Sequence, residues 1–416
     1  MKLHIAICAA LGLALAPAAH AADPVVGAAG DIACEPSNPF YNGGNGTAFA
    51  CRMRDTSDLL LGGGYDAVLL LGDNQYLSGS LSDYRTVFAP TWGRLGPLLR
   101  PAAGNHEYET RNAAGYFDYF GAAAGDRSQG WYSYDLGTWH VVVLNSNCGA
   151  IAGCGPESPQ LRWLAADLAA HPRACTLAYW HHPRFSSGPH GDDPTYDAFW
   201  RTLYDAGVDV VLAGHDHDYE RFAPQNPSGA ADPEHGIREF VVGTGGRETR
   251  PFVTADLNSE VRNDRDLGVL KLRLRVDGYD WRFLPVPGGT FTDAGSGGCH
   301  NPPNATSVPL GRGRFKAEVT WRTSDGATGV GKAAAPAADG SGLFWFFDPA
   351  NWELLVKVLD GCALNNRYWV FAAATTDVAY TLTVTDTLTG KTARYENPLG
   401  KRSPAITDVG ALDTCP

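Results

Sequence analysis

Residues 67–76 read AVLLLGDNQY, one of the repeated stretches from which the fold is predicted. Its apolar run from Ala67 to Leu71 stops at Gly72, and the acidic residue Asp73 follows at once. A short apolar run bounded by glycine is typical of a strand that is buried on both faces. The glycine indicates a tight exit at which the backbone passes close to another group. The stretch therefore predicts a buried strand that presents polar side chains at its carboxyl end.

The same pattern occurs at four other places between residues 25 and 217. Apolar runs end in polar or charged residues at 25–31 (VVGAAGD), 100–107 (RPAAGNHE), 175–182 (CTLAYWHH) and 208–217 (VDVVLAGHDH). Helices are expected between them, at residues 56–61 and after Ser158 and Pro159, where serine can cap the helix and proline can occupy its first turn. Alternating strands and helices predict an α/β layered fold, whose ligands gather beyond the carboxyl ends of the strands.

The character of the sequence changes after Val286. Residues 285–308 (PVPGGTFTDAGSGGCHNPPNATSV) are rich in Gly, Pro and Asn, and we interpret them as a linker or a long covering segment. From about residue 311 onward the stretches are alternating or aromatic, as in FKAEVTW and NRYWVFAAAT. We therefore expect a main domain at 22–300, a linker at 301–311 and a small all-β sandwich module at 312–416.

The N-terminus and the composition restrict the location and the partners of the protein. Residues 1–21 have the features of a secretory signal peptide, with Lys2, an apolar run and an Ala-His-Ala cleavage site, so the protein is expected to be secreted or periplasmic. No later stretch is long and apolar enough to span a bilayer. The formal net charge is -12 and no basic run is present, which disfavours nucleic-acid binding. The oligomeric state is left open.

Eight cysteines follow the signal segment, and an even number in an exported chain favours disulfides. The sequence alone does not choose among their possible pairings. Proximity favours Cys34 with Cys51, Cys148 with Cys154, and Cys362 with Cys415. Cys175 and Cys299 are left over and could pair with each other.

Potential metal ligands cluster at the ends of the predicted strands. They are Asp31 (GDIAC), Asp73 and Tyr76 (GDNQY), Asn105 and His106 (GNHE), His181 (WHHP), and His215 and His217 (GHDHDYER). Trivalent and borderline divalent metals bind such mixtures of oxygen and imidazole donors. A lone Gly-Asp at a strand end is usually a capping turn, but five such motifs in order favour a dinuclear site. A central carboxylate such as Asp73 could bridge two ions about 3.5–4 Å apart.

The ordered motifs GD, GDxxY, GNHE, HxP and GHxH resemble those of the calcineurin-like metallophosphoesterase superfamily. They look most like its purple acid phosphatase branch. Most of the superfamily begins with D-x-H, whereas Ala33 occupies the position of that histidine here, and Tyr76 stands where the purple branch has a tyrosine ligand. The resemblance covers residues 25–300 and implies a four-layer α/β/β/α sandwich, with 22–300 as its catalytic domain.

The resemblance also implies which residues hold each ion. The first ion, Fe(III), would be held by Asp31, Asp73, Tyr76 and His217. The second, a divalent Fe, Zn or Mn ion, would be held by Asp73, Asn105, His181 and His215. His181 rather than His182 is the implied ligand because the family pattern is His, any residue, Pro, and Pro183 fixes the frame.

Such a centre would hydrolyse small-molecule phosphate monoesters by attack of a metal-bound hydroxide, as an acid phosphatase. His106 and His190 are the candidates for protonating the leaving group. Two roles stay open for Glu107, which either orients His106 or caps a turn. Arg184, Arg221 and Arg247 could contact phosphate or form structural ion pairs. The alternatives are a phosphodiesterase or nucleotidase and, from another class, a non-catalytic surface protein whose metals only stabilise the fold.

Overall fold

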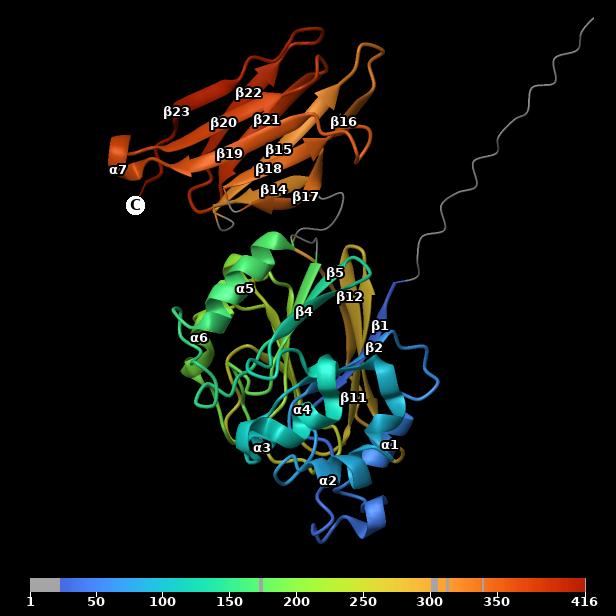
Figure 1. Cartoon of the computed structure of the whole chain (residues 1–416). Helices are drawn as coiled ribbons and strands as arrows, with labels where there is room; N and C mark the ends of the chain where they lie inside the picture. The colour runs from blue at the N-terminus through green and yellow to red at the C-terminus, as the bar shows by residue number, and fades with distance from the viewer. Residues whose placement is uncertain (1–22, 172–174, 301–305, 312–313, 339, 416) are drawn as a thin grey trace, which may run out of the picture.

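The structure is a computed structural model, and it describes residues 23–171, 175–300, 306–311, 314–338 and 340–415. The signal peptide expected at residues 1–21 lies outside this range. Two β-sheets and the helices that cover them form the first part of the chain (Figure 1). A second pair of sheets forms the C-terminal part.

The first sheet has six strands in the order β13-β12-β11-β1-β2-β3. β1, β2 and β3 run parallel, and β11 is antiparallel to β1. Their bounds are β1 (Val25–Ala29), β2 (Ala67–Leu71), β3 (Leu99–Ala102), β11 (Gly268–Arg275), β12 (Gly278–Pro285) and β13 (Ala294–Gly298). Every residue of β2 is buried, as the unbroken apolar run predicts.

The second sheet has seven strands in the order β10-β8-β9-β7-β6-β5-β4. β5, β6, β7 and β9 are parallel, whereas β4, β8 and β10 pair antiparallel at the two sides. Their bounds are β4 (Tyr132–Leu136), β5 (Trp139–Val143), β6 (Cys175–Tyr179), β7 (Val210–Ala213), β8 (Tyr219–Phe222), β9 (Arg238–Val242) and β10 (Ser259–Asn263).

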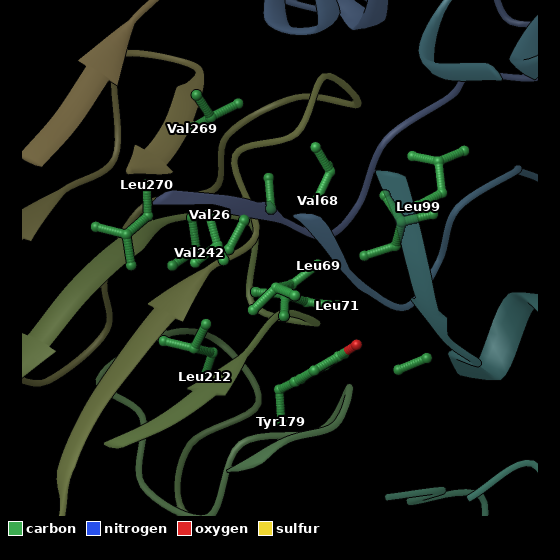
Figure 2. Close-up of a cluster of buried hydrophobic side chains, with 14 of the residues drawn as sticks. Val26, Val68, Leu69, Leu71, Leu99, Tyr179, Leu212, Val242, Val269 and Leu270 are labelled. Atoms are coloured by element: carbon green, nitrogen blue, oxygen red, sulfur yellow. The ribbon is translucent and has the colours of Figure 1, made fainter. Parts of the chain in front are cut away.

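The two sheets face each other across a common core. Figure 2 shows side chains of both sheets meeting there, among them Val26, Val68, Leu212 and Val242. A second apolar cluster lies between the seven-stranded sheet and helices α5 (Pro159–Ala170) and α6 (Asp197–Asp205), and it includes Leu164 and Trp200. Helices α1 (Met53–Asp58) and α4 (Ala114–Phe120) contribute to the first core. The expected four-layer α/β/β/α arrangement is confirmed.

The remaining helical segments are short. They are α2 (Leu81–Asp83), α3 (Asn105–Tyr108), α7 (Cys362–Asn365), the 3-10 turns η1 (Asn42–Gly44), η3 (Trp92–Leu98), η4 (Arg111–Ala113), η5 (Gly121–Ala124) and η6 (Pro194–Tyr196), and the π turn η2 (Tyr84–Phe88). The predicted cap of α5 is present, because Ser158 Oγ accepts a hydrogen bond from the Leu161 amide at 3.2 Å and Pro159 is the first helical residue. Helix α1 begins at Met53, three residues earlier than expected.

The C-terminal strands form two five-stranded sheets around a core of their own, which includes Phe315, Phe344, Val370 and Leu382. One sheet contains β14 (Ser307–Leu310), β15 (Phe315–Arg322), β16 (Thr328–Val330), β21 (Ala379–Asp386) and β22 (Thr392–Asn397). The other contains β17 (Lys332–Ala338), β18 (Ser341–Trp345), β19 (Leu354–Asp360), β20 (Tyr368–Ala374) and β23 (Ile406–Leu412). A small β sandwich is therefore present, and β14 of this sandwich lies within the stretch expected to be a linker.

Part of the glycine-rich stretch after Val286 is a strand. Residues 294–298 pair with β12 as β13 at the edge of the first sheet. A Cβ atom on Gly295 would lie 2.4 Å from the Trp281 ring, and one on Gly297 would lie 2.4 Å from the Tyr279 ring. Glycine is needed here because large rings of the neighbouring strand lie over the backbone. Because β13 is rich in glycine, its sequence does not show the apolar pattern that predicts a strand.

Four disulfides are present: Cys34–Cys51, Cys148–Cys154, Cys175–Cys299 and Cys362–Cys415. Three of them are the pairs that proximity in the sequence suggested, and Cys175–Cys299 joins the two cysteines that were left over. The first joins the 35–50 loop to the end of β1, and the third joins the start of β6 to the segment after β13. Among the described residues, no helix has both the length and the apolar composition needed to cross a bilayer.

Candidate metal centre

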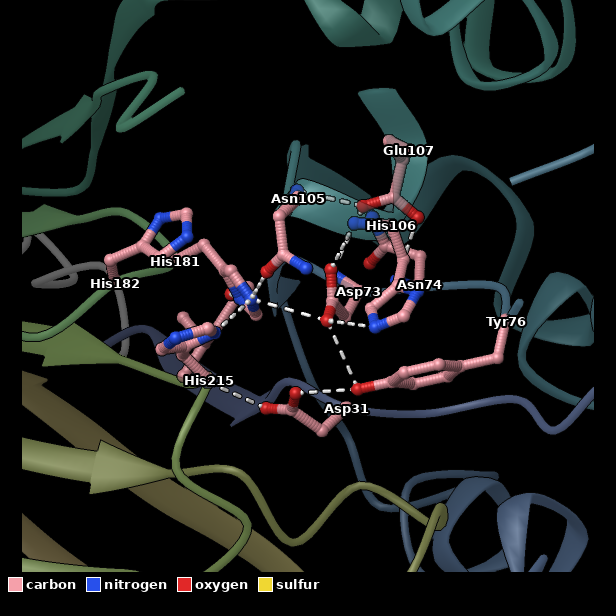
Figure 3. A network of polar contacts seen from close by, with 12 residues as sticks. Asp31, Asp73, Asn74, Tyr76, Asn105, His106, Glu107, His181, His182 and His215 are labelled. Carbon is pink, nitrogen blue, oxygen red and sulfur yellow. Dashed lines mark hydrogen bonds and ion pairs between the residues drawn. The ribbon is translucent and has the colours of Figure 1, made fainter. Parts of the chain in front are cut away.

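The polar side chains that follow five strands converge at one edge of the two sheets (Figure 3). β1 leads to Asp31, β2 to Asp73 and Tyr76, β3 to Asn105, β6 to His181, and β7 to His215 and His217. These are the seven ligand candidates of the sequence analysis. The structure brings all of them into a single cluster.

Close backbone packing explains the glycines that precede these residues. A Cβ on Gly72 would lie 2.6 Å from the His181 ring, and a Cβ on Gly104 would lie 2.1 Å from Asp73 Oδ1. Asp73 itself has a φ of 48°, in the left-handed region that non-glycine residues rarely adopt. Such a conformation persists at a functional site only where the surroundings enforce it.

Four donor atoms surround one point of the cluster. The Tyr76 hydroxyl lies 2.8 Å from Asp31 Oδ1, 3.0 Å from Asp73 Oδ2 and 3.0 Å from His217 Nε2. His217 Nε2 also lies 3.3 Å from Asp31 Oδ1. All four side chains are almost fully buried. The set contains three oxygen atoms and one imidazole nitrogen.

A second group of donors lies around His181 Nε2. This atom is 3.3 Å from Asp73 Oδ2, 3.1 Å from Asn105 Oδ1 and 3.3 Å from His215 Nδ1. The other ring nitrogen of His181 donates to the Leu71 carbonyl at 2.8 Å. That hydrogen bond fixes the ring and directs Nε2 into the cluster, as a backbone carbonyl does for a metal-binding histidine.

One carboxylate oxygen belongs to both groups. Asp73 Oδ2 contacts Tyr76 of the first group and His181 of the second. The other oxygen of this carboxylate, Oδ1, accepts the His106 amide at 2.9 Å, so the carboxylate is held in one orientation. Asp73 therefore occupies the central position that the sequence analysis expected.

Glu107 supports the turn that carries Asp73. This carboxylate is fully buried, and its Oε2 accepts the amides of Asp73 at 2.9 Å and Gly104 at 2.7 Å. Its Oε1 accepts the amides of Asn74 at 3.0 Å and Gln75 at 3.3 Å, and the Tyr84 hydroxyl at 2.9 Å. It makes no hydrogen bond to the His106 ring. Of the two roles left open for Glu107, the structure supports capping a turn rather than orienting His106. The turn that Glu107 caps is the one that follows β2.

The two catalytic candidates lie at the border of the cluster. His106 Nδ1 donates to the Leu77 carbonyl at 2.6 Å, and its Nε2 lies 3.7 Å from Asp73 Oδ2. His190 Nδ1 donates to Asp216 Oδ1 at 2.6 Å, and the His190 ring lies 4.0 Å from that of His215. The His190 side chain is 41% exposed, so it is accessible to a ligand from solvent.

The partner of His190, Asp216, was not predicted from the sequence. Asp216 is fully buried between His215 and His217, and it also accepts the Ser186 hydroxyl at 2.5 Å. The sequence shows an aspartate in GHDH, but it does not show that this aspartate contacts His190, because the two residues are 26 positions apart.

His182 lies beside the cluster and not in either group of donors. Its Nδ1 lies 2.7 Å from Ser146 Oγ, and its ring stacks on Tyr196 at 5.7 Å. Burial lowers the pKa of His182 to about 3, with a smaller contribution from the charge of His181. Its ligand atom is nevertheless within 4.8 Å of those of His181 and His215.

The three arginines considered for phosphate contact have other partners. Arg184 pairs with Asp197 at 2.5 Å, and Arg221 pairs with Asp293 at 2.8 Å. Arg247 pairs with Glu35 at 2.9 Å, and it also lies 4.7 Å above the Tyr76 ring, in contact with the cluster.

Burial and the neighbouring carboxylates shift the pKa values of several donors in the cluster. Burial and then the carboxylates of Asp31 and Asp73 raise the pKa of Tyr76 far above that of a free phenol. Burial alone would lower the pKa of His181, but Asp73 outweighs it and raises the pKa to about 9. Burial would likewise lower the pKa of His217, and Asp31 raises it to about 9. Positive charge is therefore stabilised at the His181 and His217 rings.

The spacing of the donors fits metal coordination. Two ligands of one ion, each about 2.1 Å from it and at a right angle, lie about 3.0 Å apart. The contacts of Tyr76 with its three neighbours are 2.8–3.0 Å, and those of His181 Nε2 with its three neighbours are 3.1–3.3 Å. The residues present therefore fit a metal ion in each group of donors.

The family model of the calcineurin-like phosphoesterases matches residues 30–219, a range that contains every candidate ligand from Asp31 to His217. Residues 30–219 are a calcineurin-like phosphoesterase domain. Purple acid phosphatase 15 of Arabidopsis thaliana is 31% identical over 204 residues, which are 40% of this chain and 38% of that protein. A nucleotide pyrophosphatase/phosphodiesterase of Hordeum vulgare is 26% identical over 244 residues, 50% of this chain and 65% of that protein.

The phosphoesterase domain also has a structural relative among purple acid phosphatases. The enzyme from yellow lupin (Lupinus luteus) seeds superposes with a TM-score of 0.55 at 18% identity, over 66% of this chain and 53% of the lupin chain. This similarity shows a shared fold. The resemblance to the purple acid phosphatase branch is thus confirmed, while the chain spans less than two thirds of the length of each of these relatives.

Proposed function

We propose that this chain hydrolyses phosphate esters with two metal ions bound at the strand ends of the phosphoesterase domain. The observation that carries the proposal is the position of Asp73 Oδ2 between two groups of donors, 3.0 Å from the Tyr76 hydroxyl and 3.3 Å from His181 Nε2. A shared carboxylate is what holds two ions at the short separation that phosphoryl transfer uses.

The donor chemistry supports different ions in the two groups. The first ion would be bound by Asp31, Asp73, Tyr76 and His217. The three oxygen ligands of this set suit a hard trivalent ion, Fe(III). Asp73, Asn105, His181 and His215 would bind the second. With two imidazoles and a neutral amide, this set suits divalent Fe, Zn or Mn.

Bound ions would activate a water molecule and neutralise the phosphate oxygens. The remaining work falls to side chains of the chain itself. His190, held by Asp216, would place Nε2 toward the leaving group and donate a proton to the departing oxygen. His106 is oriented in the same way by the Leu77 carbonyl, and its Nε2 faces the cluster. One of these two rings would act as the general acid for the departing oxygen.

Leaving-group dependence tests the role of His190. A phenolate leaves without much help, whereas an alkoxide needs a proton. In the H190A variant, hydrolysis of an alkyl phosphate should therefore fall by about 100-fold or more, and hydrolysis of p-nitrophenyl phosphate should fall much less. H235A, which removes a histidine outside the cluster, is the control. Equal losses on both substrates would remove the general-acid role from His190.

A monoesterase with an acidic optimum is the favoured activity. The similarity to the Hordeum vulgare nucleotide pyrophosphatase/phosphodiesterase favours diesters as a second candidate. Parallel assays of metal-loaded protein on p-nitrophenyl phosphate and bis-p-nitrophenyl phosphate separate the two. A third outcome is that neither substrate is hydrolysed, although the wild type binds two ions and N105A binds only one. That outcome would favour the non-catalytic alternative, in which the metals only stabilise the fold.

The location of the protein is part of the same proposal. Four disulfides support export to an oxidising compartment, either secretion or the periplasm. Fractionation of the producing cells, with thiol alkylation under denaturing conditions, tests it. Protein found in the cytoplasm with free thiols would contradict export.

A further inference from the structure

A second group of histidine and carboxylate side chains lies at the other end of the seven-stranded sheet. His140 is the second residue of β5 and pairs in register with Thr176 at the start of β6. β6 ends before His181, five residues further along the chain, which places the two groups about 16 Å apart at 3.3 Å per residue. The group around His140 is therefore separate from the candidate metal centre.

Both ring nitrogens of His140 face carboxylates. Nδ1 lies 2.9 Å from Asp135 Oδ1, and Nε2 lies 2.9 Å from Asp167 Oδ2. The His140 side chain is only 1% exposed. A carboxylate that accepts one ring N–H and leaves the other nitrogen facing a site is the usual support of a metal-binding histidine. Asp135 holds this supporting position.

Asp167 and His171 complete the group from the end of helix α5. Asp167 lies in the last turn of the helix, and His171 directly follows Ala170, its last residue. Asp167 Oδ1 lies 3.1 Å from His171 Nδ1 and accepts the Ser133 hydroxyl at 2.8 Å. The rings of His140 and His171 are stacked, with centroids 4.9 Å apart. One ligand atom from each of His140, Asp167 and His171 lies within 4.8 Å of the others.

We infer that His140 Nε2, a carboxylate oxygen of Asp167 and His171 Nδ1 bind one divalent transition-metal ion, of which zinc is the representative. Two imidazoles and one carboxylate are a common set for zinc, and water would complete a tetrahedral site. The ion replaces the proton that otherwise lies between His140 Nε2 and Asp167. His171 Nδ1 exchanges its 2.9 Å contact with the Asp167 carbonyl for the ion.

The exposure of the three side chains defines how the ion would enter. His140 and Asp167 are 1% and 7% exposed, whereas His171 is 45% exposed. Entry from solvent would therefore pass the His171 side. Once bound, the ion would connect β5 to the end of α5, and it would stabilise the fold without contacting the phosphoesterase centre.

Zinc counting on the full chain tests this inference. The wild type and three variants are equilibrated with micromolar free zinc, and zinc per chain is measured by elemental analysis. H171A removes an exposed ligand and D167N removes the central charge, whereas H235A removes a histidine outside both groups. We expect H171A to hold one zinc fewer than the wild type, D167N to bind that zinc at least about tenfold more weakly, and H235A to match the wild type.

Thermal unfolding gives a second measurement that does not depend on stoichiometry. Zinc added to protein whose phosphoesterase centre is already loaded should raise the melting temperature of the wild type and of H235A, but not that of H171A. Equal zinc content in the wild type and H171A, together with equal melting shifts, would overturn the inference. His140 would then be a charged histidine between two aspartates and nothing more.

Discussion

Replacement of Glu107 by glutamine tests how the turn that carries Asp73 is supported. Glu107 accepts four backbone amides, two at each carboxylate oxygen, in a fully buried position. In E107Q, one oxygen becomes an NH₂ group, which faces two amides in either orientation of the side chain. Each buried donor left without an acceptor costs about 1–3 kcal/mol, so we expect the free energy of unfolding to fall by about 2–6 kcal/mol.

Urea unfolding of chelator-treated protein measures this change without a contribution from bound metal. The experiment belongs at pH 8, because burial and then the charge of Asp73 raise the pKa of Glu107 to about 7 and the wild type must be ionised. E109Q alters an exposed glutamate two residues away and should change stability by less than about 0.5 kcal/mol. If E107Q were as stable as E109Q, the supporting role of Glu107 would be refuted.

Three further predictions concern the centre and the fold around it. Y76F should retain the fold but lose the visible tyrosinate-to-Fe(III) absorption of iron-loaded protein; an unchanged band would remove Tyr76 from the ligands. D216N should lower kcat by about 10–100-fold with little change in KM, because His190 loses its orientation; a change in KM alone would contradict this. Burial raises the pKa of Asp209 to about 6, so the folded state retains a proton that the unfolded state loses above about pH 4. The unfolding free energy should therefore fall by about 2 kcal/mol from pH 4 to 6, and D209N should have a flatter profile in equilibrium unfolding.

The central strands and the candidate ligands could be predicted because their signal is local. In β2, an apolar run, Gly72 and Asp73 follow one another, and the parallel arrangement brings such strand ends to one edge. His181 and His215 also follow the carboxyl ends of parallel strands, so they could be predicted to lie in the same cluster of candidate ligands. The amide-accepting role of Glu107 was not predictable, because it depends on the turn after β2 lying against the start of α3.

Features that depend on contacts between distant segments were also missed. Asp216 supports His190 across 26 residues, and His140 meets Asp167 across 27. β13 was hidden because glycine is selected there by the rings of Tyr279 and Trp281, and glycine carries no strand signal. Each case requires the register of a sheet or the packing of a loop, which no local pattern contains.

An anomalous difference map from crystals of metal-loaded protein tests the shared role of Asp73 most directly. Two peaks should appear about 3.5–4 Å apart on either side of the Asp73 carboxylate, one next to the Tyr76 hydroxyl and the other next to His181 Nε2. A single peak, or two peaks of which neither lies within bonding distance of Asp73, would contradict a dinuclear centre.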